Sequence, residues 1–142
     1  MQIAPRLLHL AAHHIESDKQ APIFSALQLA GQVLSVEQCY DLLLRGSELV
    51  VLSGCKTAAG LDTGGALLAF QSAFLGAGAQ HILSSLWSVH DRDVATWMQY
   101  FYSHYANGGS PSMALQRTQR SLLADPAYRH PALWAAFGCS RR

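Results

Sequence analysis

The chain has 142 residues, of which 50% are hydrophobic and 13% are charged, and its formal net charge is +1. This length suits a single domain with a buried core, and the composition excludes an intrinsically disordered chain, a basic nucleic-acid-binding surface and a membrane span, which needs ~18 consecutive apolar residues. The N-terminus lacks the charged start of a signal peptide, and three widely spaced cysteines suit reduced thiols, so we expect a cytoplasmic protein.

Strands and helices are predicted to alternate along the chain. In chain order, the predicted elements are a strand at 7–12, a hairpin at 26–29 and 32–34, a helix at 35–44, a strand at 49–52, a helix at 66–75, a strand at 81–87, and helices at 91–105 and 110–124. The tail, residues 131–137, is expected to pack on the core. This order predicts an α/β fold with a largely parallel sheet.

Chemistry-bearing residues follow two of the predicted strands. Sites in open α/β sheets form beyond the carboxyl ends of the strands, where His13-His14 ends the first strand and Cys55 follows the strand at 49–52. If these strands are neighbours, the imidazole can activate the thiol for attack on an acyl carbon and then protonate the leaving amine. The spacing is close to the ~50 residues that separate the histidine and cysteine of caspases.

Two other interpretations of these residues stay open at this point. Cys55 can be an inert core thiol, with His13-His14 as a polar turn. His9, His13 and His14 can also be zinc ligands together with Cys55. However, His9 and His13 are predicted on a strand and no second cysteine is near, so we expect no metal and no cofactor.

Three longer segments resemble the CHAT family of caspase-like cysteine peptidases. They are residues 7–13 (LLHLAAH), 49–57 (LVVLSGCKT) and 85–91 (SLWSVHD), and Phe101-Tyr102, Ala114-Leu115 and the tail at 130–137 match in the same order. CHAT domains are related to separase and are often attached to tetratricopeptide repeats. The resemblance implies a caspase-like sandwich in which residues 1–142 form part of a CHAT domain, its catalytic C-terminal half.

By this resemblance, His13 takes the position of the catalytic histidine and Cys55 that of the nucleophile. The family usually has glycine after its histidine, and the backbone N–H of that residue forms the oxyanion hole together with that of the cysteine. Here His14 stands in that place, and a bulky residue can distort the hole. The implied function is a cysteine endopeptidase. The alternative is a catalytically inactive CHAT-type module that binds other proteins.

The resemblance to separase also bears on the substrate. Separase cleaves after arginine, and acidic residues just beyond the corresponding strand help to form its pocket. Asp91 and Asp93 occupy that region here, which implies cleavage after a basic residue. The alternative is that both aspartates only cap the following helix.

The expected partners follow from these interpretations. They are a protein or peptide substrate and a repeat domain or upstream segment, but no nucleic acid and no membrane. The chain lacks the strands that precede Leu7 in the family, and it stops at residues 138–142 without the apolar strand residues that normally follow the tail. We therefore expect an unpaired edge at the strand over 7–12, which favours self-association or the addition of a partner strand.

Overall fold

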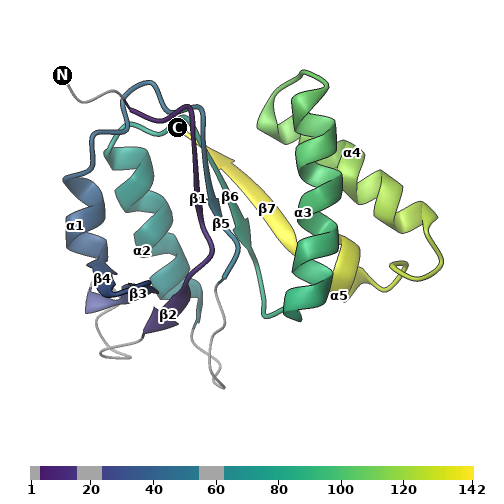
Figure 1. Ribbon diagram of the computed structural model, residues 1–142, viewed down its shortest axis with the longest axis horizontal. Helices are drawn as coiled ribbons and strands as arrows, with labels where there is room; N and C mark the ends of the chain where they lie inside the picture. Colours follow the sequence, from purple (N-terminus) through teal and green to yellow (C-terminus); the bar gives the residue numbers. More distant parts are fainter. Residues whose placement is uncertain (1–3, 16–23, 55–62) are drawn as a thin grey trace.

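A computed structural model describes residues 4–15, 24–54 and 63–142, although not the side chains of His13, His14, Thr63 and Gly64. A central sheet lies between two layers of helices (Figure 1). The strands are β1 (Leu7–Leu10), β2 (His13–Ile15), β3 (Ala26–Leu29), β4 (Gln32–Ser35), β5 (Leu49–Leu52), β6 (His81–Ser85) and β7 (Phe137–Arg141). The helices are α1 (Val36–Tyr40), α2 (Thr63–Gly76), α3 (Asp91–Ala106), α4 (Pro111–Ala124) and α5 (Pro131–Trp134).

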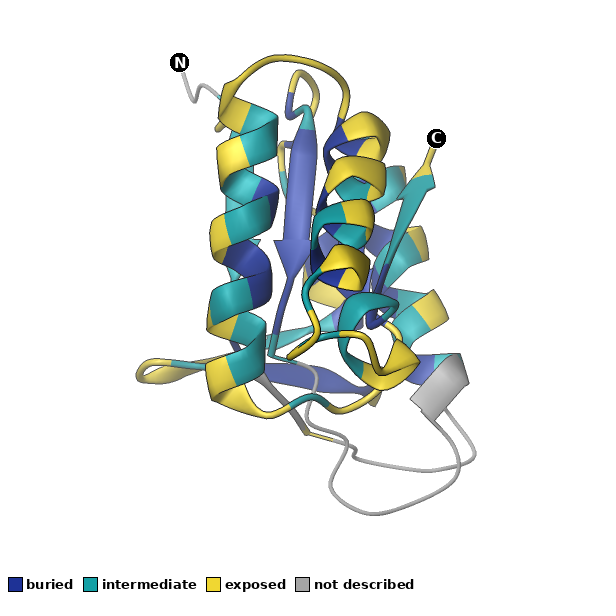
Figure 2. Ribbon diagram, turned by 90° about the vertical axis from the view of Figure 1, so that its right-hand side faces the viewer, coloured by how far each residue is buried: buried dark blue, intermediate teal, exposed yellow. Residues whose placement is uncertain are grey.

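The central sheet has the order β1-β5-β6-β7. The first three strands are parallel, with Leu8 beside Val50 and Val50 beside Ile82, and β7 runs antiparallel to β6. Strand β5 is the most deeply buried, since none of its four residues is more than 1% exposed. Figure 2 shows this buried layer in dark blue between helices whose outer surfaces are exposed. A strand covered on both faces accounts for the continuous Leu-Val-Val-Leu sequence.

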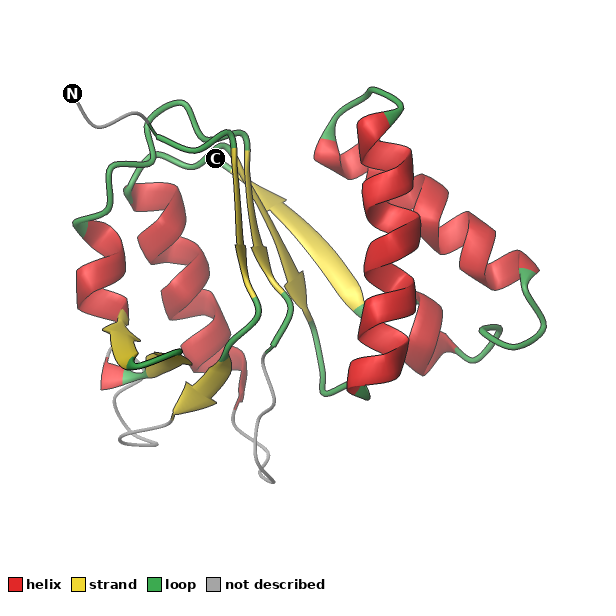
Figure 3. Cartoon of the chain, in the orientation of Figure 1, coloured by secondary structure: helices red, strands yellow, loops and turns green. Residues whose placement is uncertain are grey.

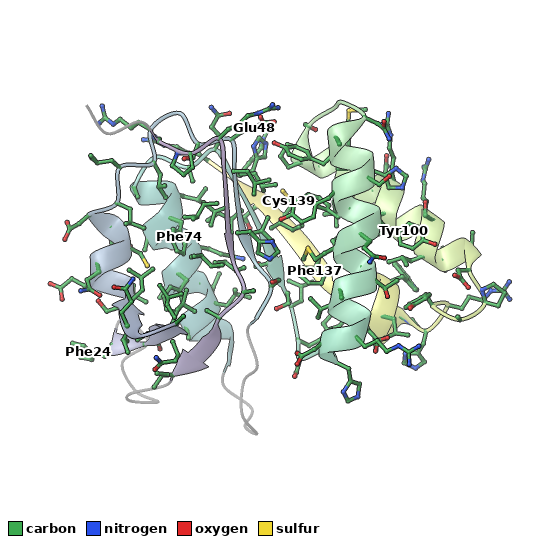
Figure 4. All side chains as sticks on the ribbon, viewed as in Figure 1. Phe24, Glu48, Phe74, Tyr100, Phe137 and Cys139 are labelled. Carbon is green, nitrogen blue, oxygen red and sulfur yellow. The ribbon has the colours of Figure 1, made fainter. Side chains whose placement is uncertain are left out.

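Each face of the sheet carries its own core, because successive side chains of a strand point to opposite faces. Val50 and Ile82 pack with Phe74 of α2 and with α1 on one face. Val51 and Leu83 pack with residues of α3, α4 and β7, among them Phe137, on the other. Figure 4 shows Phe74 and Phe137 on opposite sides of the strands. The predicted mostly parallel α/β sandwich is confirmed.

A second, smaller sheet has the order β2-β3-β4 and is antiparallel throughout. It lies beneath the ends of α1 and α2 (Figure 3). The predicted hairpin over 26–29 and 32–34 is confirmed as β3 and β4. Strand β2 adds to β3, with His13 opposite Gln28 and His14 opposite Leu27.

Two predicted boundaries at the N-terminal side of the chain are wrong. The first strand ends at Leu10 rather than at Ala12, because the chain leaves β5 there and His13-His14 join the second sheet. The predicted capping box of Ser35 and Gln38 is present, but α1 ends at Tyr40 instead of Leu44. The Leu44 N–H donates to the Ala77 carbonyl (3.2 Å), so this segment docks on the end of α2 instead of continuing the helix.

The C-terminal half also differs from the predictions. The tail is not only packed on the core: Phe137–Arg141 forms β7 and pairs with β6 along its whole length. Strand β6 ends at Ser85 rather than at Trp87, because the Leu86 N–H already donates to Ala136 outside the ladder (2.8 Å). The helix at 91–105 is confirmed as α3, but His90 is its N-cap residue and makes no side-chain capping bond. Asp91 and Asp93 therefore lie in the first turn of α3 and not at its N-cap position.

Within the described ranges, no helix is both long and apolar enough to cross a membrane. The ion pair between Arg6 and Glu48 (2.8 Å) lies at the end of β5 where the strand begins. Figure 4 shows Glu48 at that end. The opposite end of β5, where Ser53 and Gly54 follow, is the end that leads toward Cys55.

Candidate functional site

The carboxyl ends of β1 and β5 lie side by side, as the dyad hypothesis requires. Leu10 pairs with Leu52, and the Ser53 N–H donates to the Leu10 carbonyl (3.2 Å). The two segments that lead to His13 and to Cys55 therefore leave the sheet from adjacent strands. Cys55 itself lies outside the described residues, and so do the side chains of His13 and His14.

Gly54 and Ala12 bring these two segments into backbone contact. A Cβ built on Gly54 would lie within 2.8 Å of the N, C and O atoms of Ala12. Any residue larger than glycine at position 54 would force the two backbones apart, since rigid backbone atoms cannot yield as a flexible side chain can. Ala12 directly precedes His13, and Gly54 directly precedes Cys55. The assignment of His13 and Cys55 as a dyad stays a prediction.

Three polar side chains form a hydrogen-bonded row near this contact and link β1, the end of β5 and α3. The Nε2 atom of His9 lies 2.6 Å from Oγ of Ser53, and its Nδ1 atom lies 2.8 Å from the hydroxyl of Tyr102. From the sequence, His9 is a candidate metal ligand only, and Ser53 and Tyr102 lie in the segments that resemble the family without a predicted role of their own. The strand period held a signal, because His9 and Ser53 fall on the face that the helix at 91–105 covers.

Burial favours the uncharged forms of His9 and Tyr102 around neutral pH. Desolvation lowers the pKa of His9 below its ordinary value of 6.5 and raises the pKa of Tyr102 to about 12. With a neutral imidazole, one ring nitrogen donates and the other accepts, so two proton arrangements are available. In one, Ser53 donates to His9 and His9 donates to Tyr102. In the other, both bonds run the opposite way.

A cavity of about 370 Å³ opens beside the His9–Ser53 pair. Its lining residues come from the β1 exit, the β5 exit and the start of α3: His9, Ala11, Ala12, Ser53, Gly54, Asp91, Val94, Ala95 and Met98. Asp91 supplies the one carboxylate among these residues, and Asp93 is not among them. The structure thus brings Asp91, but not Asp93, to the end of the strand that leads to Cys55.

The two other cysteines lie in environments that suppress thiol chemistry. Cys39 is fully buried, and desolvation raises its pKa to about 12. Desolvation also raises the pKa of the partly buried Cys139, and the bond from Ser112 offsets this only in part. Both thiols therefore stay protonated at neutral pH, and a protonated thiol is a poor nucleophile. The part of the chain that the structure describes has no group of three or more histidine, cysteine or acidic side chains arranged to hold a metal ion.

Comparison with known proteins identifies one family and two similar proteins. A sequence model of the CHAT domain matches residues 2–142. Tetratricopeptide repeat protein 28 of Mus musculus is 34% identical over 126 residues, which cover 89% of this chain and 5% of the mouse protein. The Homo sapiens protein of the same name is 36% identical over 90 residues, which cover 63% of this chain and 4% of the human protein.

Proposed function

Because the chain belongs to the CHAT domain family, part of the caspase-like superfamily, we propose that it is a cysteine endopeptidase with Cys55 as nucleophile and His13 as general acid and base. The observation that supports this most is the backbone contact between Gly54 and Ala12, the residues directly before the two proposed catalytic groups. Neighbouring parallel strands that end at the same edge of the sheet bring the residues after them together. A nucleophile and its general base must lie within hydrogen-bonding reach of each other, so the proposed dyad needs this proximity.

The proposed reaction is acyl transfer through a thioester. His13 accepts the thiol proton, and the Cys55 sulfur attacks the scissile carbonyl carbon to give a tetrahedral intermediate. The backbone N–H groups of Cys55 and His14 are the proposed donors to its oxyanion. The C–N bond breaks as His13 returns the proton to the leaving amine. Water, deprotonated by His13, then attacks the thioester carbon. The C–S bond breaks, the carboxylic acid product leaves, and His13 returns the proton to the Cys55 sulfur.

We further propose that cleavage follows a basic residue of the substrate. The support for this is Asp91, which is one of the residues that line the cavity beside Ser53 and Gly54. A carboxylate at this position favours a guanidinium or ammonium group and repels an acidic side chain.

The chain spans about one-twentieth of the length of the curated relatives that it matches. Both relatives are named as tetratricopeptide repeat proteins. We propose that this domain works together with a repeat domain that presents its protein substrate.

Selective alkylation tests the nucleophile. Iodoacetamide near neutral pH is expected to modify Cys55 faster than Cys39 or Cys139 by an order of magnitude or more, because burial keeps those two thiols protonated. His13→Ala should slow the alkylation of Cys55 and leave the rates at Cys39 and Cys139 unchanged, because only Cys55 depends on the proposed base. Peptide mapping by mass spectrometry reads the three sites in one sample, and equal rates at all three would contradict the proposal. Cys55→Ala and His13→Ala should each reduce peptidase turnover by about 10³-fold or more.

The second candidate is a catalytically inactive interaction module, and His14 is the residue that favours it. If His14 prevents an oxyanion hole from forming, Cys55 can be reactive toward iodoacetamide while peptide turnover is absent. His14→Gly places the usual family residue there. Turnover that appears only in His14→Gly would establish the inactive module, whereas turnover in the unmodified chain would exclude it.

A further inference from the structure

Ser53, the residue directly before Gly54, is anchored to β1 in two ways. Its N–H donates to the Leu10 carbonyl (3.2 Å), which continues the contact with β1 one residue beyond β5. Its hydroxyl oxygen lies 2.6 Å from Nε2 of His9. Ser53 is only 9% exposed, so water is a poor substitute for the bond to His9. Both the backbone and the side chain of Ser53 are therefore held by β1.

Tyr102 of α3 holds the His9 ring from its other side. The hydroxyl of Tyr102 lies 2.8 Å from Nδ1 of His9, and the two ring centroids are 5.8 Å apart. A phenol is more acidic than a serine hydroxyl and is the stronger donor, so the favoured arrangement has Tyr102 donating to Nδ1. Nε2–H then donates to the Ser53 oxygen. The bond at one ring nitrogen thus sets the tautomer and the orientation in which the other nitrogen meets Ser53.

We propose that His9 is a positioning residue: through Ser53 it keeps the Gly54 backbone in place. Gly54 has no side chain that could anchor it, so its position depends on its neighbours along the chain. The backbone atoms of Ala12 lie against it, and a displaced Ser53 would let the two backbones separate. Tyr102 supports this role indirectly, because it holds the His9 ring in the orientation that reaches Ser53.

The inference rests on the proposed function, because the spacing of the proposed dyad gives the row its purpose. Ala12 and Gly54 directly precede His13 and Cys55, so their contact sets how far apart the two catalytic groups start. A displacement of about one ångström between a nucleophile and its base costs on the order of 10²-fold in rate. In this role His9 acts through backbone position and not on the reacting atoms.

Amide hydrogen exchange at residue 53 tests the inference without any need for turnover. This amide donates to Leu10, so its exchange rate measures how often the end of β5 opens locally. His9→Leu removes the partner of the Ser53 hydroxyl and should raise the rate about tenfold, the effect of one lost buried hydrogen bond. Tyr102→Phe should raise it several-fold. His9→Gln keeps an amide group within reach of Ser53 and should restore part of the protection.

Two further variants separate positioning from a general loss of stability. Thr118→Val is the matched control, because it also removes a buried hydroxyl, one that donates to Ala114 within α4 (2.8 Å). It should leave exchange at residue 53 unchanged. If Tyr102 acts through Ser53, Tyr102→Phe should have almost no further effect in a chain that already carries Ser53→Ala. Circular dichroism confirms that each variant is folded.

Alkylation of Cys55 by iodoacetamide supplies a second readout, at the proposed nucleophile. His9→Leu and Tyr102→Phe should slow it several-fold near neutral pH, where the thiol depends on its base. The limiting rate at high pH, where the thiol is ionised without help, should be unchanged. Thr118→Val should alter neither rate. A residue that only stabilises the fold would leave this pH profile as it is in the unmodified chain.

The possible results separate this inference from the proposed peptidase activity. Unchanged exchange at residue 53 in folded His9→Leu and Tyr102→Phe, or an equal change in Thr118→Val, would overturn the inference. Additive effects in the double variant, or a reactive Cys55 whose pH profile is the same in every variant, would overturn it as well. If exchange responds as expected but Cys55 is unreactive even in the unmodified chain, the peptidase assignment fails and the positioning of Gly54 by His9 stands.

Discussion

Gly54 shows how much of the site depends on a single missing side chain. Its backbone has no positive φ, so the position does not need glycine for conformational reasons. It needs glycine because Ala12 leaves no space for a Cβ. The contact holds Gly54, directly before Cys55, against Ala12, directly before His13, and widening it by even one ångström would separate the proposed nucleophile from its proposed base.

Gly54→Ala is therefore expected to impair both stability and activity. The added methyl group meets backbone atoms, so the free energy of unfolding should fall by roughly 3 kcal/mol, at the upper end of the range for overpacking. Peptidase turnover should fall more than stability alone explains, because the dyad is displaced. Urea denaturation and a peptide assay at low temperature, where the variant is folded, measure the two effects.

Gly31→Ala is the matched control for this change. Gly31 has φ +81° and no atom within 4 Å of its absent Cβ, so alanine there is strained but not obstructed. It should cost about 1 kcal/mol and leave turnover unchanged. If Gly54→Ala were no more destabilising than Gly31→Ala, the contact with Ala12 would not be a steric constraint.

The residues of the candidate site differ in how far sequence could predict them. His13 and Cys55 follow apolar runs and stand in matching family segments, so the sequence alone singles them out. Ser53 and Tyr102 are an ordinary serine and one residue of an apolar helix face. Their role depends on three elements packing together, which spacing within one element does not reveal. Gly54 could be placed after a strand, but the close approach of Ala12 arises only from the pairing of β1 with β5.

At the scale of elements, the two aspartates of the first turn of α3 lie on different faces of the helix, and only Asp91 is on the face that lines the cavity. Successive helical residues are 100° apart, so Asp91 shares a face with Val94, Ala95 and Met98, while Asp93 does not. All four residues of that face line the cavity. The sequence proposal named both aspartates, whereas the helix geometry favours Asp91 alone.

Asp91→Asn and Asp93→Asn form a matched pair that tests this difference. In a fluorogenic peptide panel, the unmodified chain is expected to prefer arginine, then lysine, before the scissile bond. Asp91→Asn should reduce kcat/KM for arginine substrates about tenfold or more, because a charge-assisted hydrogen bond becomes a neutral one. Asp93→Asn should leave the preference unchanged. A preference for aspartate or an apolar residue, or an effect at Asp93 equal to that at Asp91, would end the assignment.

Elements with strong local signals could be predicted, and those formed by tertiary pairing could not. The strand over 49–52 was predictable because a continuous apolar run is typical of a buried strand. The helix that starts at Pro111 was predictable because proline favours the first helical position. Phe137–Arg141 contains glycine, serine and arginine, which carry little strand signal. It becomes β7 because the edge of β6 supplies hydrogen-bond partners, and this tertiary effect outweighs weak local propensity.

At the scale of the whole molecule, the central sheet has one edge at β7 and one at β1. Among the described strands, β1 pairs only with β5. The carbonyls of Arg6 and Leu10 accept bonds from the β5 side. In a parallel ladder alternate residues bond to the same neighbour, so the backbone groups of Leu7 and His9 face the open side. All four residues of β1 are partly exposed, and such an edge is a ready template for another strand.

We therefore expect the isolated chain to self-associate through β1 as its concentration rises. Light scattering should show the mean mass increasing, and amide hydrogen exchange should show the Leu7 and His9 amides becoming protected over the same concentration range. The Val51 amide in the buried β5 is the control and should be protected at every concentration. A monomer with unchanged exchange at Leu7 and His9 across the range would contradict self-association. Growing mass without protection at these two amides would locate the contact elsewhere on the surface.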